Sequence, residues 1–144
     1  MSHIEELFSL KGKSAIVIGG SGVLGSEMSR ALASAGANTA IFYSGNEEGA
    51  KEVSASVASL GVQSSIHQVD VRSSDSIQKA VDAVSDAWGG VDILINAPGV
   101  NSATPLMEIE EEEWDRIMDV NLKGVFGLSE RRSIRSSPGT WRAG

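Results

Sequence analysis

The 144-residue sequence contains no cysteine and only two histidines, His3 and His67, which lie far apart in the chain. Without cysteine, the sequence offers no disulfide, no thiolate metal site and no cysteine nucleophile. The two histidines show no spacing typical of metal ligands. We therefore predict no metal site.

Long apolar runs and an excess of positive charge are also lacking. No stretch of about 18 apolar residues occurs, which predicts that no segment spans a membrane. Residues 1–11 lack the basic and apolar regions of a secretory signal, so we expect a cytoplasmic protein. The formal net charge of −7 disfavours nucleic-acid binding, because an acidic surface repels phosphates.

The sequence does contain a regular alternation of short apolar runs and amphipathic stretches. Four buried strands are predicted at residues 14–19, 39–43, 65–71 and 91–96. Helices are predicted from Val23 to Gly36, from Asn46 to Gly61, from Ser73 or Ser74 to Gly89, and from Glu110 onward. This alternation predicts an α/β fold in three layers, a Rossmann-type doubly wound parallel sheet with strand order 3-2-1-4.

A glycine-rich turn lies between the first predicted strand and the first predicted helix. Residues 18–25 read IGGSGVLG and satisfy both GxGxxG and GxxGxxG. Glycines here permit a sharp turn, close approach of the backbone to a pyrophosphate, and close packing of helix on strand. The pyrophosphate would meet the free N–H groups at the helix start. A tight turn without a ligand is the alternative, but the position of the motif favours dinucleotide binding.

The end of the second predicted strand bears on the choice of cofactor. NAD-binding proteins of this kind carry a carboxylate about 20 residues after the glycine motif, where it binds the ribose 2′-OH. Tyr43, Ser44 and Gly45 provide none, and Glu47 and Glu48 suit the first turn of the next helix. The missing carboxylate favours NADP over NAD, although no arginine nearby in the sequence would bind the 2′-phosphate.

Five motifs in this order resemble the short-chain dehydrogenase/reductase family across residues 7–128. They are LFSLKGK at residues 7–13, the glycine turn, Asp70-Val71, NAPG at residues 96–99, and Asn121 within VNLKG. Residues 43–48 look most like the β-ketoacyl-carrier-protein reductases, with sugar and polyol dehydrogenases as close competitors. The resemblance implies hydride transfer between NAD(P) and a ketone or secondary alcohol.

The resemblance also implies a set of site residues. Those expected to bind the cofactor are Gly19, Ser21, Gly22, Leu24, Gly25, Tyr43, Ser44, Asp70, Val71, Asn96, Ala97 and Gly99. Asn121 matches the asparagine of the family's catalytic tetrad. A purely structural role stays open for three of these residues: Asp70 as a loop cap, Asn96 as a strand-end turn, and Asn121 as a backbone-bonding helix residue.

Three positions depart from the family pattern. Val23 occupies the usual place of the second glycine, and Ile18 replaces a threonine whose hydroxyl would tie the turn to the fourth-strand motif. Pro98 replaces a small residue and removes a backbone donor. These departures bear on cofactor affinity rather than on the fold.

The serine, tyrosine and lysine that would complete the family's tetrad have no counterpart in this sequence. Its one tyrosine is Tyr43, no lysine follows Lys123, and no YxxxK motif occurs. A tyrosine that acts as an acid near neutral pH needs a neighbouring cation to lower its pKa. After Leu128 the resemblance stops and arginine becomes frequent, at Arg131, Arg132, Arg135 and Arg142.

We therefore expect an incomplete dinucleotide-binding domain at residues 1–128 and an irregular basic tail at residues 129–144. The chain is expected to be truncated after the helix that carries Asn121 and to be inactive alone, while its parent enzyme acts on a small carbonyl or alcohol substrate. A non-catalytic dinucleotide-binding module and an inactive fragment are the alternatives. The strand at residues 91–95 would then be an apolar edge, which predicts self-association.

Overall fold

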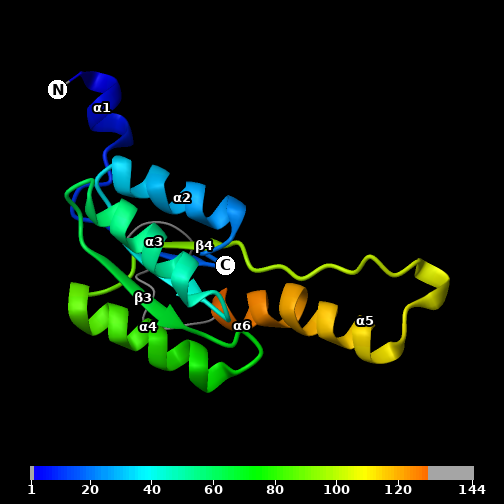
Figure 1. Cartoon of the computed structure of the whole chain (residues 1–144). Helices are drawn as coiled ribbons and strands as arrows, with labels where there is room; N and C mark the ends of the chain where they lie inside the picture. The colour runs from blue at the N-terminus through cyan, green and yellow to red at the C-terminus, as the bar shows by residue number, and fades with distance from the viewer. Residues whose placement is uncertain (1, 130–144) are drawn as a thin grey trace, which may run out of the picture.

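The computed structural model describes residues 2–129, which form a parallel sheet with helices on both faces (Figure 1). The four strands are β1 (Ser14–Ile18), β2 (Asn38–Tyr43), β3 (Ser64–Gln68) and β4 (Ile93–Asn96). They lie in the order β3-β2-β1-β4, and every neighbouring pair is parallel. The predicted strand order 3-2-1-4 is therefore confirmed. The basic tail predicted at residues 129–144 lies, from residue 130 onward, outside the described residues.

The helices alternate with the strands as the sequence predicts. They are α1 (His3–Phe8), α2 (Val23–Ser34), α3 (Glu47–Ala58), α4 (Ser74–Trp88), α5 (Glu111–Met118) and α6 (Val125–Ser129), with a 3-10 turn η1 (Leu106–Glu108) and a π-helical turn η2 (Asp119–Gly124). The predicted N-cap Asn46 accepts a hydrogen bond from the Gly49 N–H, and Ser73 caps α4 by accepting from the Ser76 N–H.

Sequence reasoning missed α1, although the chain carries a signal for it. The Ser2 hydroxyl accepts from the Glu5 N–H while the Glu5 carboxylate accepts from the Ser2 N–H, which is a capping box. The Ser-x-x-Glu spacing that makes this box can be read directly from the sequence.

The core lies in two layers, one on each face of the sheet. On one face, Ile16, Ile18 and Phe42 pack against Ile77 and Val81 of α4. On the other, side chains of β2 pack against α2 and α3; this cluster comprises Ala33, Ile41, Tyr43, Ala50, Val53 and Val57. Successive residues of β1 and β2 therefore face opposite helical layers, so these central strands are apolar throughout, as predicted.

The third strand differs from the prediction in both length and polarity. The sequence suggested an apolar run at residues 65–71, whereas β3 ends at Gln68 and has the sequence SSIHQ, with only partial burial. It pairs with β2 alone, so it is an edge strand. Polar side chains on an edge oppose pairing with other chains, which explains why an apolar run was the wrong expectation here.

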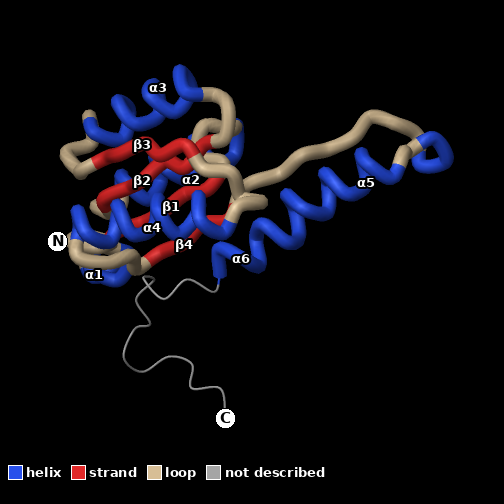
Figure 2. Tube along the Cα trace, turned by 90° about the horizontal axis from the view of Figure 1, so that it is seen from below, coloured by secondary structure: helices blue, strands red, loops and turns tan. Residues whose placement is uncertain are grey.

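The loop after β4 and the following helices project from the sheet as an arm, defined here as residues 97–124 (Figures 1 and 2). The arm begins at the end of β4, runs outward to η1, and returns through α5 and η2. The helix predicted from Glu110 onward is confirmed, but η2 interrupts it at the turn that contains Asn121. None of the helices in residues 2–129 is both long and apolar enough to cross a membrane.

Candidate functional site

A cavity of about 750 Å³ lies at the carboxyl ends of the strands and extends to the start of the arm. Predicted site residues line it from every strand: Gly19, Ser21, Gly22, Tyr43, Ser44, Asp70, Val71, Ala97 and Gly99. Leu24, Gly25, Asn96 and Asn121 are not in its lining. Open parallel sheets bind ligands in such crevices, where the strand order reverses, so three of the five motifs and the end of β2 meet there.

The glycine turn brings the backbones of β1, α2 and the arm into direct contact. Gly19 has φ +72°, and a Cβ there would overlap the carbonyl oxygen of Ala97. A Cβ on Gly25, in the first turn of α2, would overlap the carbonyl oxygen of Gly19. Both glycines are therefore required by close approach, as the motif predicts.

The start of α2 has the donor set that an anionic group would need. Its N-cap is Gly22, which provides no side-chain cap for the first N–H groups of the helix. Such N–H groups, together with the positive end of the helix dipole, favour a phosphate. Since Gly22 and Ser21 both line the cavity, the turn fits the pyrophosphate of a dinucleotide.

Backbone hydrogen bonds hold the glycine turn around Ile18. The Ala97 N–H donates to the Ile18 carbonyl over 3.0 Å, and the Gly19 and Gly20 N–H groups both donate to the Phe42 carbonyl. The turn is thus bonded to β2 and to the start of the arm through the backbone, with no hydrogen bond from the side chain at position 18.

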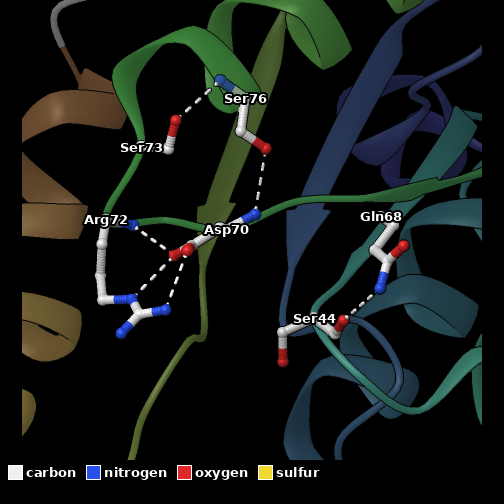
Figure 3. Close-up of polar contacts among 6 residues, drawn as sticks. All are labelled: Ser44, Gln68, Asp70, Arg72, Ser73 and Ser76. Atoms are coloured by element: carbon white, nitrogen blue, oxygen red, sulfur yellow. Dashed lines mark hydrogen bonds and ion pairs between the residues drawn. The ribbon is translucent and has the colours of Figure 1, made fainter.

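Asp70 lies in the cavity wall and also stabilises its own loop (Figure 3). Asp70 Oδ1 accepts hydrogen bonds from the backbone N–H and the side-chain Nε of Arg72, at 2.9 and 3.0 Å. Asp70 Oδ2 accepts from Nη2 of the same arginine at 2.9 Å. The Asp70 backbone N–H in turn donates to the Ser76 hydroxyl over 3.1 Å. The hydrogen bond from Arg72 lowers the pKa of Asp70, so the carboxylate is charged near neutral pH.

The end of β2 is held by β3 through both backbone and side chain. The Val69 N–H donates to the Tyr43 carbonyl over 2.8 Å, and the Gln68 amide donates to the Ser44 carbonyl over 2.9 Å (Figure 3). Tyr43 is buried, whereas Ser44 is exposed at the cavity.

Two arginines that sequence reasoning did not consider also line the cavity. Arg72 is paired with Asp70, and Arg116 of α5 donates to the Asn101 carbonyl over 3.3 Å. Asp70 is the single carboxylate among the described lining residues, so the site favours an anionic ligand. Arg72 could have been suspected from its position two residues after Asp70, whereas Arg116 is brought in by the return of the arm.

Asn121 lies beside the cavity and binds the backbone of the arm. Its Nδ2 donates to the Val100 carbonyl over 2.9 Å, and its Oδ1 accepts from the Val100 N–H over 3.0 Å. Val100 itself lines the cavity, as does Val120. The structural role considered for Asn121 is therefore present, and it shapes the cavity through Val100. Among residues 2–129, no group of three or more potential ligands could hold a metal ion.

Comparisons with known proteins agree with a dinucleotide-binding site. The family model described as short chain dehydrogenase matches residues 13–133. The chain is 38% identical over 122 residues to 3beta-hydroxysteroid dehydrogenase 1 of Eggerthella lenta, covering 85% of this chain and 47% of the relative. It is 35% identical over 119 residues to the 3-oxoacyl-(acyl-carrier-protein) reductase FabG of Staphylococcus epidermidis, covering 83% of this chain and 49% of that protein.

Solved structures agree with this match. A short chain dehydrogenase from Burkholderia cenocepacia, solved in complex with NADP, is 36% identical with a TM-score of 0.81, covering 84% of this chain and 49% of that one. An NAD⁺-bound xylitol dehydrogenase is 28% identical with a TM-score of 0.79, covering 83% and 46% of the two chains. The chain spans about half the length of the relatives it matches.

Proposed function

The chain belongs to the short-chain dehydrogenase/reductase family, and from this we propose that it forms the dinucleotide-binding half of an NAD(P)-dependent oxidoreductase. The observation that carries the proposal is that three motifs and the end of β2, far apart in the sequence, line one cavity. The glycine turn would hold the pyrophosphate through Gly19, Ser21 and Gly22.

The other motifs would hold the two ends of the cofactor. Asp70 and Val71 would contact the adenine, and residues 96–99 would support the ribose beside the glycine turn. Leu24, Gly25 and Asn96 would act by supporting the backbone, since they lie outside the cavity lining. The bound cofactor would supply or accept the hydride.

We further propose that NADP is preferred over NAD. Tyr43, Ser44 and Gly45 bring no carboxylate to the end of β2. The nearby Glu47 and Glu48 both pair with Lys51, at 2.9 and 3.6 Å, which reduces their repulsion of a 2′-phosphate. NADP is present in the solved Burkholderia neighbour, although the xylitol dehydrogenase binds NAD⁺.

The parent reaction that we propose is reduction of a ketone or oxidation of a secondary alcohol by hydride transfer. The 144 residues contain no YxxxK motif, and Glu47 stands four residues after Tyr43, where a lysine would be needed. Asn121 is the one member of the tetrad that we assign, and its side-chain amide is bonded to Val100. We therefore expect these residues alone to bind cofactor without turnover. Loss of binding as well would indicate an inactive fragment.

A titration of the purified chain with NADPH and NADH tests this function. Protein fluorescence, to which Trp88 and Trp114 contribute, and nicotinamide fluorescence would report binding. We expect saturable binding of both, tighter for NADPH, and no oxidation of NADPH when simple ketones are added. Absence of saturable binding would contradict the proposed site, and preference for NADH would contradict the cofactor assignment.

A further inference from the structure

The side chain of Gln68 reaches from the end of β3 to the loop that follows β2. Its Nε2 donates to the Ser44 carbonyl over 2.9 Å (Figure 3). Both residues line the cavity. Gln68 pairs with Tyr43 in the strand register, so the amide spans one residue beyond the last paired position. The backbone ladder stops there, and this side-chain bond continues the attachment of the loop to the sheet.

The bond fixes the direction of the peptide between Ser44 and Gly45. In a trans peptide the carbonyl and the following N–H point in opposite directions, and the described chain contains no cis peptide bond. Because the Ser44 carbonyl points toward Gln68, the Gly45 N–H points away from it. Figure 3 shows the Ser44 hydroxyl directed away from Gln68 as well.

The backbone at Gly45 is open on the side where a Cβ would lie. A Cβ placed on Gly45 would have no heavy atom within 4 Å. Ser44 lines the cavity and Gly45 directly follows it, so the Ser44 hydroxyl and the Gly45 N–H are the polar groups at this end of the site. The charge balance suits an anion, because Asp70 is the one carboxylate among the described lining residues and is already bonded to Arg72.

We propose that Gln68 is a positioning residue for cofactor specificity: by holding the Ser44 carbonyl, it sets the Ser44 hydroxyl and the Gly45 N–H to receive the 2′-phosphate of NADP. This inference rests on the proposed function, because it concerns one end of the same dinucleotide site. Gln68 acts through the loop and does not itself bind the phosphate. Its loss should therefore weaken NADP binding much more than NAD binding.

The matched variants are Gln68→Met and Gln63→Met. Methionine keeps the length of the glutamine side chain but removes the amide donor. Gln63 directly precedes β3, at the opposite end of the strand from Gln68, and is exposed, so the same substitution there controls for general effects on the strand. A third variant, Gln68→Glu, removes the donor and adds a negative charge beside the loop.

The experiment compares dissociation constants of the whole chain for NADPH and NADH, and for the adenosine fragments 2′,5′-ADP and 5′-ADP. One net hydrogen bond corresponds to about a 3- to 10-fold change in affinity. In Gln68→Met we expect the affinity for NADPH and 2′,5′-ADP to fall by about that factor, with that for NADH and 5′-ADP changed less than about 2-fold. Gln68→Glu should reduce NADPH binding further. Gln63→Met should leave unchanged both the ratio of the dissociation constants for NADPH and NADH and the ratio for 2′,5′-ADP and 5′-ADP.

The outcomes separate the two proposals. Suppose that the unsubstituted chain binds NADPH and that Gln68→Met weakens the binding of all four ligands by the same factor. Gln68 then has only a structural role, so the inference is overturned while the proposed function stands. An unchanged ratio of the dissociation constants for NADPH and NADH in Gln68→Met also overturns the inference. If the unsubstituted chain binds none of the four ligands, the proposed function fails and the inference fails with it.

Discussion

Gly19 combines a left-handed backbone conformation with direct contact to the loop after β4. Its φ of +72° disfavours any residue with a Cβ, and the Ala97 carbonyl occupies the place where that Cβ would lie. Gly12 has a similar φ of +80°, but a Cβ added there would meet no heavy atom within 4 Å. The two glycines therefore separate backbone strain from steric overlap.

Replacing these glycines by alanine should have unequal effects. Gly12→Ala adds backbone strain alone, so we expect a loss of about 1 kcal/mol in the free energy of unfolding. Gly19→Ala adds overlap with Ala97, so we expect a loss of at least about 2 kcal/mol and no detectable NADPH binding. Urea denaturation and cofactor titration measure both. Equal losses in the two variants would show that the contact with Ala97 yields without cost.

At the scale of elements, the arm is held together by hydrogen bonds between its outgoing loop and its returning helical segment. Asn121 binds Val100, Arg116 donates to the Asn101 carbonyl, and the Thr104 hydroxyl donates to Glu113 over 3.2 Å. Hydrogen bonds from Ser102 and Thr104 lower the pKa of Glu113, which keeps this carboxylate charged. The contact at Asn121 involves two bonds, and both are made to Val100, which lines the cavity.

Removing the Asn121 amide should release the loop at Val100. In Asn121→Leu the Val100 N–H loses its acceptor, so we expect its hydrogen exchange to become about 10-fold faster, or more. Thr104→Val removes the outermost contact and should leave Val100 exchange unchanged. Exchange measured by NMR checks this. Unchanged protection of Val100 in Asn121→Leu would mean that packing, rather than the amide, holds the loop.

The edge strand β3 carries a pH-sensitive group. His67 is half-buried, its ring meets Phe42 edge-on at 5.4 Å between centroids, and burial lowers its pKa from the usual 6.5. The folded chain therefore resists protonation of His67 more than the unfolded chain does. Above pH 6.5 His67 is neutral in both the folded and the unfolded chain, so it does not affect the free energy of unfolding. This free energy falls as the pH drops from 6.5 toward the lower pKa of the folded chain.

The free energy of unfolding should thus be lower at about pH 5.5 than at about pH 7.5. In His67→Gln, which has no titrating ring, we expect this difference to shrink. Ser65→Ala keeps the imidazole and removes its hydroxyl partner at 3.1 Å, so the difference should remain. Urea midpoints at the two pH values test this. A difference of equal size in the His67→Gln variant would assign the pH dependence to other groups.

The elements that could be predicted from the sequence are those whose pattern is local. Asn46 and Ser73 cap the predicted helices because capping is decided within four residues. The end of β3 at Gln68 could not be predicted, because it follows from the edge position of this strand in the sheet, although the polar residues of SSIHQ are present in the sequence. At the site, the glycine turn was predictable from spacing. Gln68 and Arg116 were not, since only register and the path of the arm bring them to the cavity.

At the scale of the whole molecule, the arm and the helix after it carry apolar side chains that the described residues leave exposed. Leu122 and Phe126 are 62% and 64% exposed, and Trp114 is 52% exposed. Near the start of the chain, Leu7 and Phe8 of α1 are exposed to a similar degree, at 66% and 68%. Exposed apolar groups of this size favour association because burying them removes apolar surface from water.

We expect the chain to self-associate through the returning helical segment of the arm and α6, which follows it. The double substitution Leu122→Ser and Phe126→Ser should reduce the concentration dependence of the sedimentation coefficient, whereas Leu7→Ser with Phe8→Ser should change it less. The two pairs have the same residue types and similar exposure, so a difference between them reflects their place in the fold. The contact surface would include α6, which packs beside α4 and lies next to the η2 turn that holds Asn121. A monomeric chain at every concentration, with a sharp and reversible thermal transition, would contradict this expectation. If both double substitutions reduce the concentration dependence of the sedimentation coefficient equally, the arm has no special role in self-association.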